Sequence, residues 1–300
     1  MILTVTLNAA LDVTYEMPAV DWDGVNRVAT VHRRAGGKGV NVARVLAALG
    51  RDVLVTGLAG GPTGQAIEAD LRAAGLPGAL AGIAADSRTT LVVSDPGRTA
   101  LFNEPGPEIT PDELRNFRRT YEALLADAAA VVISGSLPGG VPADTYATLA
   151  ALAADRGVPA IVDADGEPLR HAPAGRPSIV KPNIEELARA VPGGTPAEGA
   201  QALRDRGAES VVVSMGADGL LAVTPEGTFR ARMPYKVDGN PTGAGDSLVA
   251  GLALGLVESL PWPERLRQAA ALGAAAVAAP VAGDFDRDVY ADIHPQVVIT

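Results

Sequence analysis

The sequence predicts a three-layer α/β/α sandwich with a mostly parallel central sheet. Short runs rich in β-branched residues alternate along the 300 residues with longer segments rich in alanine and leucine. This alternation is typical of βαβ units whose parallel sheet is covered on both faces. Because 47% of the residues are apolar and no composition break or linker divides the chain, we expect one large domain over residues 1–300.

The predicted strands and helices follow one another along the chain. The strands are residues 2–7, 52–58, 130–134, 159–163, 178–180 and 210–214. Apolar residues at helical spacing predict helices over residues 40–49, 65–74, 111–126, 143–156, 196–206 and 247–257. The start at Pro111 is the best defined, because Thr110 can cap the helix and Glu113 completes a capping box.

Two segments break the alternation and predict a small separate sheet. Residues 89–93 and 99–103 are extended runs on either side of Asp95-Pro96-Gly97-Arg98, which has the composition of a hairpin turn. Residues 13–34 lack helical periodicity and alternate at positions 25, 27, 29 and 31. Segments at about 12–35 and 88–104 therefore form either a β-lid over a cleft or a plain surface hairpin, and the pattern alone does not choose between the two.

Composition excludes several classes of function. A net charge of −10 argues against a general nucleic-acid binder, which needs a basic surface. The absence of cysteine excludes disulfides, thiolate metal sites and a cysteine nucleophile. No apolar run reaches the roughly 18 residues of a membrane span, and residues 269–281 fit a buried helix. With no signal-peptide pattern at the start, we expect a cytoplasmic protein that does not bind membranes.

Two glycine clusters are the candidate anion-binding motifs. In Gly36-Gly37-Lys38-Gly39 the lysine is followed by glycine rather than by Ser or Thr, so a P-loop is disfavoured. After Gly243 and Gly245 the third position of a dinucleotide fingerprint is Leu248, so a nicotinamide dehydrogenase is disfavoured.

The run Gly243-Ala244-Gly245-Asp246 stands directly before an apolar helix. Its glycines would let main-chain N–H groups at the helix start point at an anion such as a transferring phosphoryl group. Asp246 could then accept the proton of an attacking hydroxyl. The alternative is that Asp246 only caps the helix.

The first cluster adds a cation at Lys38, and Asn41 offers both a donor and an acceptor, a set suited to a polyhydroxylated anionic ligand. Asp12 could accept from sugar hydroxyls, and Arg27 and Arg88 fall in the two lid segments. Taken singly, each of these residues fits a solvated surface charge better than a ligand contact.

Taken together and in order, these motifs resemble the phosphofructokinase B branch of the ribokinase-like carbohydrate kinases over nearly the whole chain. Glu104-Pro105-Gly106-Pro107 is most similar to the pattern of 1-phosphofructokinase and tagatose-6-phosphate kinase. The matching blocks are Thr6-Leu7-Asn8, Leu11-Asp12-Val13-Thr14-Tyr15, Gly36-Gly37-Lys38-Gly39-Val40-Asn41, Ser134-Gly135-Ser136-Leu137-Pro138, Lys181-Pro182-Asn183-Ile184-Glu185-Glu186, Ser214-Met215-Gly216-Ala217-Asp218-Gly219 and Gly243-Ala244-Gly245-Asp246-Ser247.

The resemblance implies a ribokinase-like fold, ATP and Mg²⁺ as cofactors, Asp246 as catalytic base, and Gly243, Ala244 and Gly245 as an anion hole. The implied contacts of the acceptor are Asp12, Gly37 and Asn41 with the sugar, and Arg27, Lys38, Arg88 and Ser136 with its phosphate. The implied nucleotide-binding residues are Lys181, Asn183, Ser214, Gly216 and Gly219. Asn183 and Glu186 would serve Mg²⁺, Glu186 through water.

Three departures from the family pattern bear on the sugar. Thr90 stands two residues after Arg88, where these kinases usually carry asparagine; Ala9 replaces a proline; and Asn240-Pro241-Thr242 leads into the catalytic turn. We expect transfer from ATP to a hydroxyl of fructose 1-phosphate, tagatose 6-phosphate or fructose 6-phosphate. The alternatives are a kinase for an unphosphorylated sugar or nucleoside, and a non-catalytic sugar-phosphate binding protein on the same fold. A homodimer through the β-lid is compatible with the resemblance.

Other residue clusters predict no site. Asp284, Asp286 and Asp288 alternate as in a calcium loop, but the sixth and twelfth positions are Val289 and Pro295, so a solvated acidic loop is favoured. The histidines lack metal-ligand spacing and no Gly-x-Ser-x-Gly elbow is present.

Overall fold

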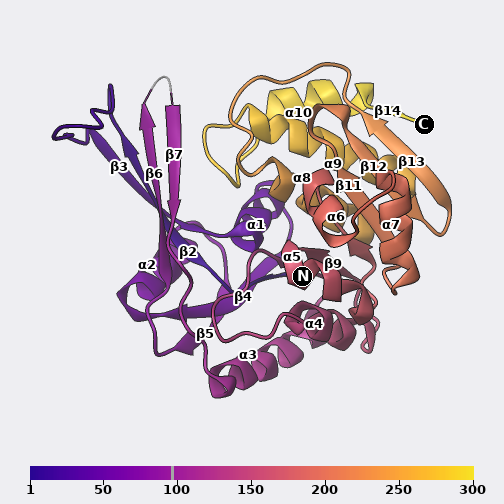
Figure 1. The fold of residues 1–300 in the computed structure, drawn as a ribbon, viewed down its shortest axis with the longest axis horizontal. Helices are drawn as coiled ribbons and strands as arrows, with labels where there is room; N and C mark the ends of the chain where they lie inside the picture. The colour runs from indigo at the N-terminus through magenta and orange to yellow at the C-terminus, as the bar shows by residue number, and fades with distance from the viewer. Residues whose placement is uncertain (96–97) are drawn as a thin grey trace.

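A ten-stranded sheet runs through the molecule between two layers of helices, and a four-stranded sheet stands at one side (Figure 1). The structure is a computed structural model that describes residues 1–95 and 98–300. It confirms the predicted three-layer α/β/α architecture.

The large sheet has the strand order β14-β13-β12-β11-β10-β9-β8-β1-β4-β5. Strands β11 to β5 in this order pair in parallel, whereas β12, β13 and β14 add an antiparallel edge that the sequence pattern did not predict. The strands are β1 (Ile2–Thr6), β4 (Val53–Gly60), β5 (Gly78–Ile83), β8 (Ala130–Ser134), β9 (Ala160–Asp163), β10 (Ile179–Val180), β11 (Ser210–Ser214), β12 (Leu220–Thr224), β13 (Gly227–Arg232) and β14 (Val298–Ile299).

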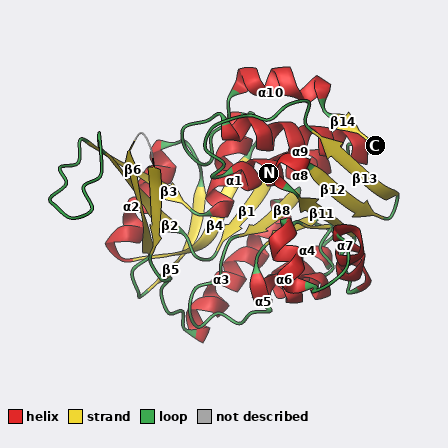
Figure 2. Ribbon diagram, turned by 45° about the horizontal axis from the view of Figure 1, so that its top comes forward, coloured by secondary structure: helices red, strands yellow, loops and turns green. Residues whose placement is uncertain are grey.

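Helices cover both faces of this sheet (Figure 2). One face carries α1 (Lys38–Ala48), α2 (Gly61–Ala73), α8 (Ala244–Val257), α9 (Trp262–Val277) and α10 (Arg287–Ile293). The other carries α3 (Pro111–Leu124), α4 (Thr145–Ala154), α5 (Gly166–His171), α6 (Ile184–Ala190) and α7 (Pro196–Asp205). None of the helices in the described ranges is long and apolar enough to cross a membrane.

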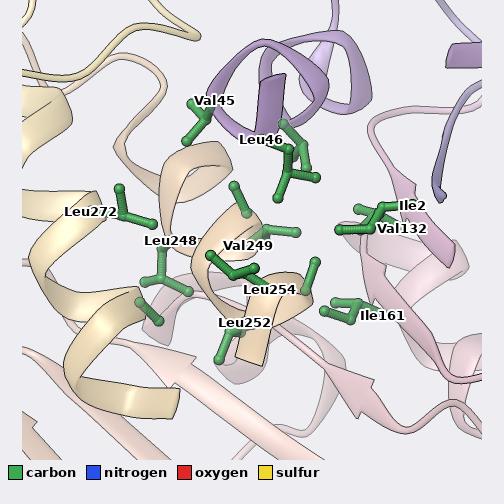
Figure 3. Packing of buried hydrophobic residues seen from close by; sticks show 14 of the residues in the cluster. Ile2, Val45, Leu46, Val132, Ile161, Leu248, Val249, Leu252, Leu254 and Leu272 are labelled. Carbon is green, nitrogen blue, oxygen red and sulfur yellow. The ribbon is translucent and has the colours of Figure 1, made fainter. Parts of the chain in front are cut away.

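Helix α8 is the most deeply buried helix of its layer, because it lies between the sheet and its neighbours α1 and α9 (Figure 3). Its side chains Leu248 and Val249 are apolar and buried. A helix that is apolar all round is expected to be enclosed in this way, and burial of each such side chain contributes about 1.5–3 kcal/mol. The packing fixes the position of the helix start, where Asp246 lies.

The four-stranded sheet, called the small sheet below, has the order β3-β2-β6-β7. Its strands are β2 (Ala10–Glu16), β3 (Thr30–Gly36), β6 (Arg88–Asp95) and β7 (Arg98–Asn103). These ranges confirm a separate sheet from the two predicted segments. Pro96 and Gly97, the centre of the predicted hairpin turn, lie outside the described residues.

Residues 17–29 form a loop, so the strand alternation predicted through position 29 is wrong there. The Asp21 amide donates to Asn26 Oδ1 at 2.8 Å, and the Asp23 amide donates to Asp21 Oδ1 at 3.0 Å. Such short polar side chains offer the backbone local partners in place of a strand ladder.

Most predicted helices differ from the structure by a few residues at their ends, but one difference matters for function. Helix α8 begins at Ala244 rather than at Ser247. Asp246 therefore lies inside the first turn of the helix rather than before it.

Candidate active site

Most of the predicted site residues gather at the carboxyl ends of the parallel strands. Ser136 lies just beyond β8, Lys181 follows β10, and Ser214 ends β11. The amino ends of α1 and α8 bring Lys38 and Asp246 to the same edge. Ligand sites of open α/β sheets form at this edge, outside the ends of the strands.

The turn before α8 requires glycine at its first position. Gly243 has φ 85°, and a Cβ there would lie 2.8 Å from Ala282 Cα. The Ala244 amide donates to Pro241 O at 3.2 Å. Ala244 N–H thus has a main-chain acceptor, and its predicted part in the anion hole stays a prediction. Within the described residues the Gly245 and Asp246 amides have no main-chain acceptor, so these two N–H groups can face an anion.

Asp246 is a nearly buried carboxylate, with 6% of its surface exposed. Asn41 Nδ2 donates to its Oδ2 at 2.8 Å, so Asn41 contacts the predicted base directly. Burial and the Asp163 carboxylate raise the pKa of Asp246 to about 6, against the opposing effects of Asn41, Lys38 and Lys181. A carboxylate with this pKa is ionised at pH 7 yet basic enough to take a proton.

Asp163, which sequence reasoning missed, is the central anion of the site. Its side chain is fully buried and pairs with Lys38 Nζ at 3.3 Å and with Lys181 Nζ at 3.2 Å. Ser134 Oγ donates to it at 3.1 Å. Burial alone would raise the pKa of Asp163, but the two ammonium groups hold it below its usual value. The one available signal was its place at the end of the predicted strand 159–163.

The same carboxylate keeps Lys38 charged. Burial lowers the pKa of Lys38, but Asp163, Glu186 and Asp246 outweigh this effect and raise the pKa above the usual lysine value. A half-exposed cation that is fixed at this position suits an anionic ligand or developing negative charge.

A cavity of about 400 Å³ opens beside these charges. Arg88 enters it from the small sheet, where its Nε donates to Asn8 O at 3.2 Å. Two buried oxygens on its wall, Thr6 Oγ1 and Asn8 Oδ1, have no partner among the described residues. Both oxygens are closed off from solvent, so in this conformation they are not presented to a ligand. The lining residues are Thr6, Asn8, Gly37, Lys38, Arg88, Asn103, Glu104, Pro105, Gly106, Gly135, Ser136 and Leu137.

Asp246 does not line this cavity itself. It lies against the first turn of α1, whose Gly37 and Lys38 do line it. Asp12 stands at the base of the small sheet, where a Cβ on Gly36 would overlap its carboxylate. Burial raises the pKa of Asp12, against smaller opposing effects of Thr90 and Arg88.

A second cavity of about 510 Å³ shares Lys38 and Ser136 with the first. Its wall is more apolar, with Leu137 and Pro138 on one side, and Glu186 closes the side near Asp163.

The predicted nucleotide residues lie on adjacent strand ends. Asn183 pairs with Ser214 in an isolated bridge, which places Lys181 and Asn183 beside the Ser214–Gly219 segment. Gly216 and Gly219 both have positive φ, 58° and 88°. A Cβ on Gly219 would lie 2.0 Å from Ala231 O, so this position requires glycine.

Asn183 and Glu186 form the capping box of α6. Glu186 N donates to Asn183 Oδ1 at 2.8 Å, and Asn183 N donates to Glu186 Oε2 at 2.7 Å. The second carboxylate oxygen, Oε1, faces Lys38 Nζ at 4.0 Å. A hard, partly buried oxygen of this kind fits a hydrated Mg²⁺. The described part of the chain holds no cluster of three or more His, Cys, Asp or Glu residues that could bind a metal alone.

Arg27 is not brought to the site within one chain. It is exposed in the loop of residues 17–29 and lines neither cavity. Its predicted contact with a phosphate stays a prediction.

Comparison with known proteins decides the family. A family model described as "pfkB family carbohydrate kinase" matches residues 6–286. The chain belongs to the pfkB family of carbohydrate kinases. A kinase of this family uses ATP and typically Mg²⁺, so the chain is an ATP-dependent sugar kinase and the binding-protein alternative loses its support.

Solved structures of pfkB-type kinases agree with the fold. Phosphofructokinase-2 from Escherichia coli in complex with fructose-6-phosphate is 32% identical, with 98% of each chain covered and a TM-score of 0.87. A possible 1-phosphofructokinase from Thermotoga maritima is 26% identical over 100% of this chain and 98% of its own, with a TM-score of 0.89. Ribokinase from Arabidopsis thaliana, 22% identical over 98% of each chain with a TM-score of 0.74, shares the fold.

Proposed function

We propose that this kinase transfers the γ-phosphoryl group of ATP to a hydroxyl of a phosphorylated ketohexose, with Asp246 as general base. The observation that carries the proposal is the first turn of α8. There a carboxylate with a pKa of about 6 stands beside the Gly245 and Asp246 amides, which have no main-chain acceptor in residues 1–95 and 98–300. One turn of helix can therefore accept a proton and hold the oxygens of the transferring group.

The residues of the chain divide the chemistry among them. Asp246 accepts the proton of the attacking hydroxyl, and Asn41 Nδ2 holds its carboxylate in place. The helix-start amides donate to the phosphoryl oxygens. Lys38 and Lys181, held by Asp163, offset the negative charge that develops on transfer.

ATP and Mg²⁺ find suitable groups next to this turn. Lys181, Asn183, Ser214, Gly216 and Gly219 would hold the nucleotide, and Glu186 would hold Mg²⁺ through water. The bound ion would neutralise charge on the phosphates. Movement of the small sheet over the cavity would exclude water during transfer.

A phosphorylated acceptor is favoured because the cavity collects cations in a chain of net charge −10. Arg88 and Lys38 both line it, and a phosphate on the acceptor would give both cations a further anionic partner. The related Escherichia coli phosphofructokinase-2 was solved with fructose-6-phosphate, which supports the same class of acceptor here.

An acceptor screen with ATP and Mg²⁺ tests the proposal. It compares fructose 1-phosphate, fructose 6-phosphate and tagatose 6-phosphate with free fructose, free tagatose, ribose and a nucleoside. We expect kcat/KM for at least one ketohexose phosphate to exceed that for every unphosphorylated acceptor by a hundredfold or more. A preference for an unphosphorylated sugar or nucleoside would refute the proposal.

A further inference from the structure

We propose that Asn103 is a specificity-determining residue that donates its side-chain amide to the phosphate of the acceptor sugar. The inference rests on the proposed function, since it needs a phosphorylated acceptor in the 400 Å³ cavity. Asn103 is the last residue of β7 and pairs in antiparallel register with Thr90 of β6. Its side chain is exposed on the cavity wall together with Arg88 and Lys38.

Hydrogen-bond directions show that the Asn103 amide has donors to spare. Arg88 Nη1 lies 3.2 Å from Thr90 Oγ1, and a guanidinium only donates, so the Thr90 oxygen is the acceptor. The Thr90 hydroxyl can then give its own proton to Asn103 Oδ1, also at 3.2 Å. In this arrangement both N–H groups of Asn103 Nδ2 have no acceptor among the described residues.

The Thr90 hydroxyl has a second nearby acceptor in Asp12, whose pKa it helps to lower. If the hydroxyl proton goes to Asp12, the Asn103 amide turns and gives one N–H to Thr90 Oγ1. The other N–H of Nδ2 still lacks an acceptor within the described part of the chain. Either orientation thus leaves at least one donor for a ligand.

The surroundings of this donor select an anion. Arg88 and Lys38 supply positive charge on the same wall. Glu104, next to Asn103, also lines this wall near Arg88, and its Oε2 accepts from the Thr89 amide at 2.7 Å, so the wall sets two cations against this one carboxylate. A neutral amide donor beside a guanidinium adds a charge-assisted hydrogen bond to a phosphate oxygen without a further charge to desolvate.

This arrangement gives the Thr90 side chain a role between Arg88 and Asn103. Thr90 is 6% exposed and does not line the cavity, so its hydroxyl does not meet a ligand there. Asn103 presents an amide to the cavity from the neighbouring strand, and Thr90 is the positioning residue that joins it to Arg88.

Four full-length proteins test the inference: wild type, Asn103→Asp, Asn103→Ala and Asn116→Asp. Asn103→Asp keeps the shape of the side chain and exchanges its donors for negative charge. Asn116→Asp makes the same change on the exposed face of α3 and controls for net charge. The measurements are kcat and KM for fructose 1-phosphate, fructose 6-phosphate and tagatose 6-phosphate, KM for ATP, and the thermal unfolding midpoint.

For the preferred sugar phosphate we expect Asn103→Asp to raise KM by about tenfold or more and Asn103→Ala to raise it less. The values of kcat and of KM for ATP should stay within about threefold of wild type, and Asn116→Asp should match wild type throughout. A wild-type KM in a folded Asn103→Asp protein would overturn the Asn103 inference alone. A wild-type enzyme that prefers free sugars would overturn the proposed function as well.

Discussion

Two buried carboxylates at the active site have pKa values shifted in opposite directions. Lys38 and Lys181 keep the pKa of Asp163 low, so it stays an anion. Burial and the repulsion of Asp163 raise the pKa of Asp246 to about 6. When the environments of two neighbouring carboxyl groups shift their pKa values in opposite directions, the two groups have different roles in acid–base catalysis. In the proposed function, Asp246 is the proton acceptor of the pair, and Asp163 is the fixed charge that tunes its pKa.

The pH dependence of wild type and of Asp163→Asn tests this division. The base acts when ionised, so kcat/KM of wild type should fall as pH drops below about 6. In Asp163→Asn a repulsive charge is gone while both lysines remain, which lowers the pKa of Asp246. The acid limb should therefore move to lower pH, and kcat should fall because the base is weaker and the lysines are less fixed.

Asp163→Asn also removes the carboxylate that pairs with both lysines in the described part of the chain. Loss of one partner of a buried pair costs about 3–5 kcal/mol. Denaturant unfolding measures this cost. Asp155→Asn, which breaks the exposed pair with Arg176, is the control and should change stability by less than about 1 kcal/mol. An unshifted acid limb together with unchanged stability in Asp163→Asn would contradict the assigned role.

At the scale of single residues, the sequence motifs located Asp246, Lys38 and Lys181, because each stands in a glycine-rich or strand-end block. Asp163 could not be chosen in the same way. It follows a plain apolar run with no motif around it, and its partners come from α1 and from the end of β10. Only the folded sheet shows that three charged side chains meet there.

At the scale of elements, the start of α8 positions both the base and the free amides. Gly243 is held in the left-handed region with Ala282 against it, so the residues after α9 help to shape the turn. Because α8 is extensively buried behind that turn, the helix cannot shift to relieve a clash at Gly243.

Replacement of Gly243 by alanine should therefore reduce turnover strongly. A left-handed alanine costs about 1–2 kcal/mol, and the contact at 2.8 Å forces the turn to shift away from the phosphoryl group. We expect kcat to fall at least a hundredfold. Gly50→Ala is the matched control, because Gly50 has φ 75° with open space around it and should lose stability but keep kcat. Similar kcat values for the two variants would show that the contact with Ala282 is unimportant.

The sequence predicted elements well where a cap or a strong period was present, as at α3, whose Thr110–Glu113 capping box is formed as expected. It placed the start of α8 three residues late, because Gly-Ala-Gly gives no helical signal although tertiary packing extends the helix through it. Strands β12 to β14 were missed because they pair only after distant parts of the chain come together.

At the scale of the whole molecule, the small sheet is joined to the rest of the site by few polar contacts. Arg34 of β3 donates to both carboxylate oxygens of Asp284, at 2.6 Å and 3.3 Å. Asp284 follows the Ala282–Gly283 segment that packs against Gly243 and Asn41. Any movement of the small sheet is therefore linked to the segment that shapes the catalytic turn.

The small sheet also leaves large apolar side chains exposed, with Phe102 at 51% and Leu101 at 48%. We propose that this sheet mediates a homodimer, since large apolar side chains that are left exposed favour a partner surface. Sedimentation equilibrium should give twice the 30.5 kDa of one chain. Phe102→Asp should shift the mass toward one chain, whereas Val298→Asp, at the exposed edge strand β14, should not. A one-chain mass for wild type at micromolar concentration would refute the dimer.

A buried base carries a cost for the whole fold. Because the pKa of Asp246 is about 6 in the folded state, against 3.8 for an ordinary aspartate, the ionised form is disfavoured by folding. This destabilisation is fully present above pH 6 and disappears as pH falls toward 4. At pH 8 it amounts to at most about 3 kcal/mol.

The most direct test of the central claim is the turnover of Asp246→Asn measured beside its thermal unfolding midpoint at pH 8. If Asp246 is the general base, kcat should fall by roughly 10²- to 10⁴-fold. The midpoint should be equal to or above that of wild type, which rules out loss of fold as the cause. Near wild-type turnover in this variant would contradict the account.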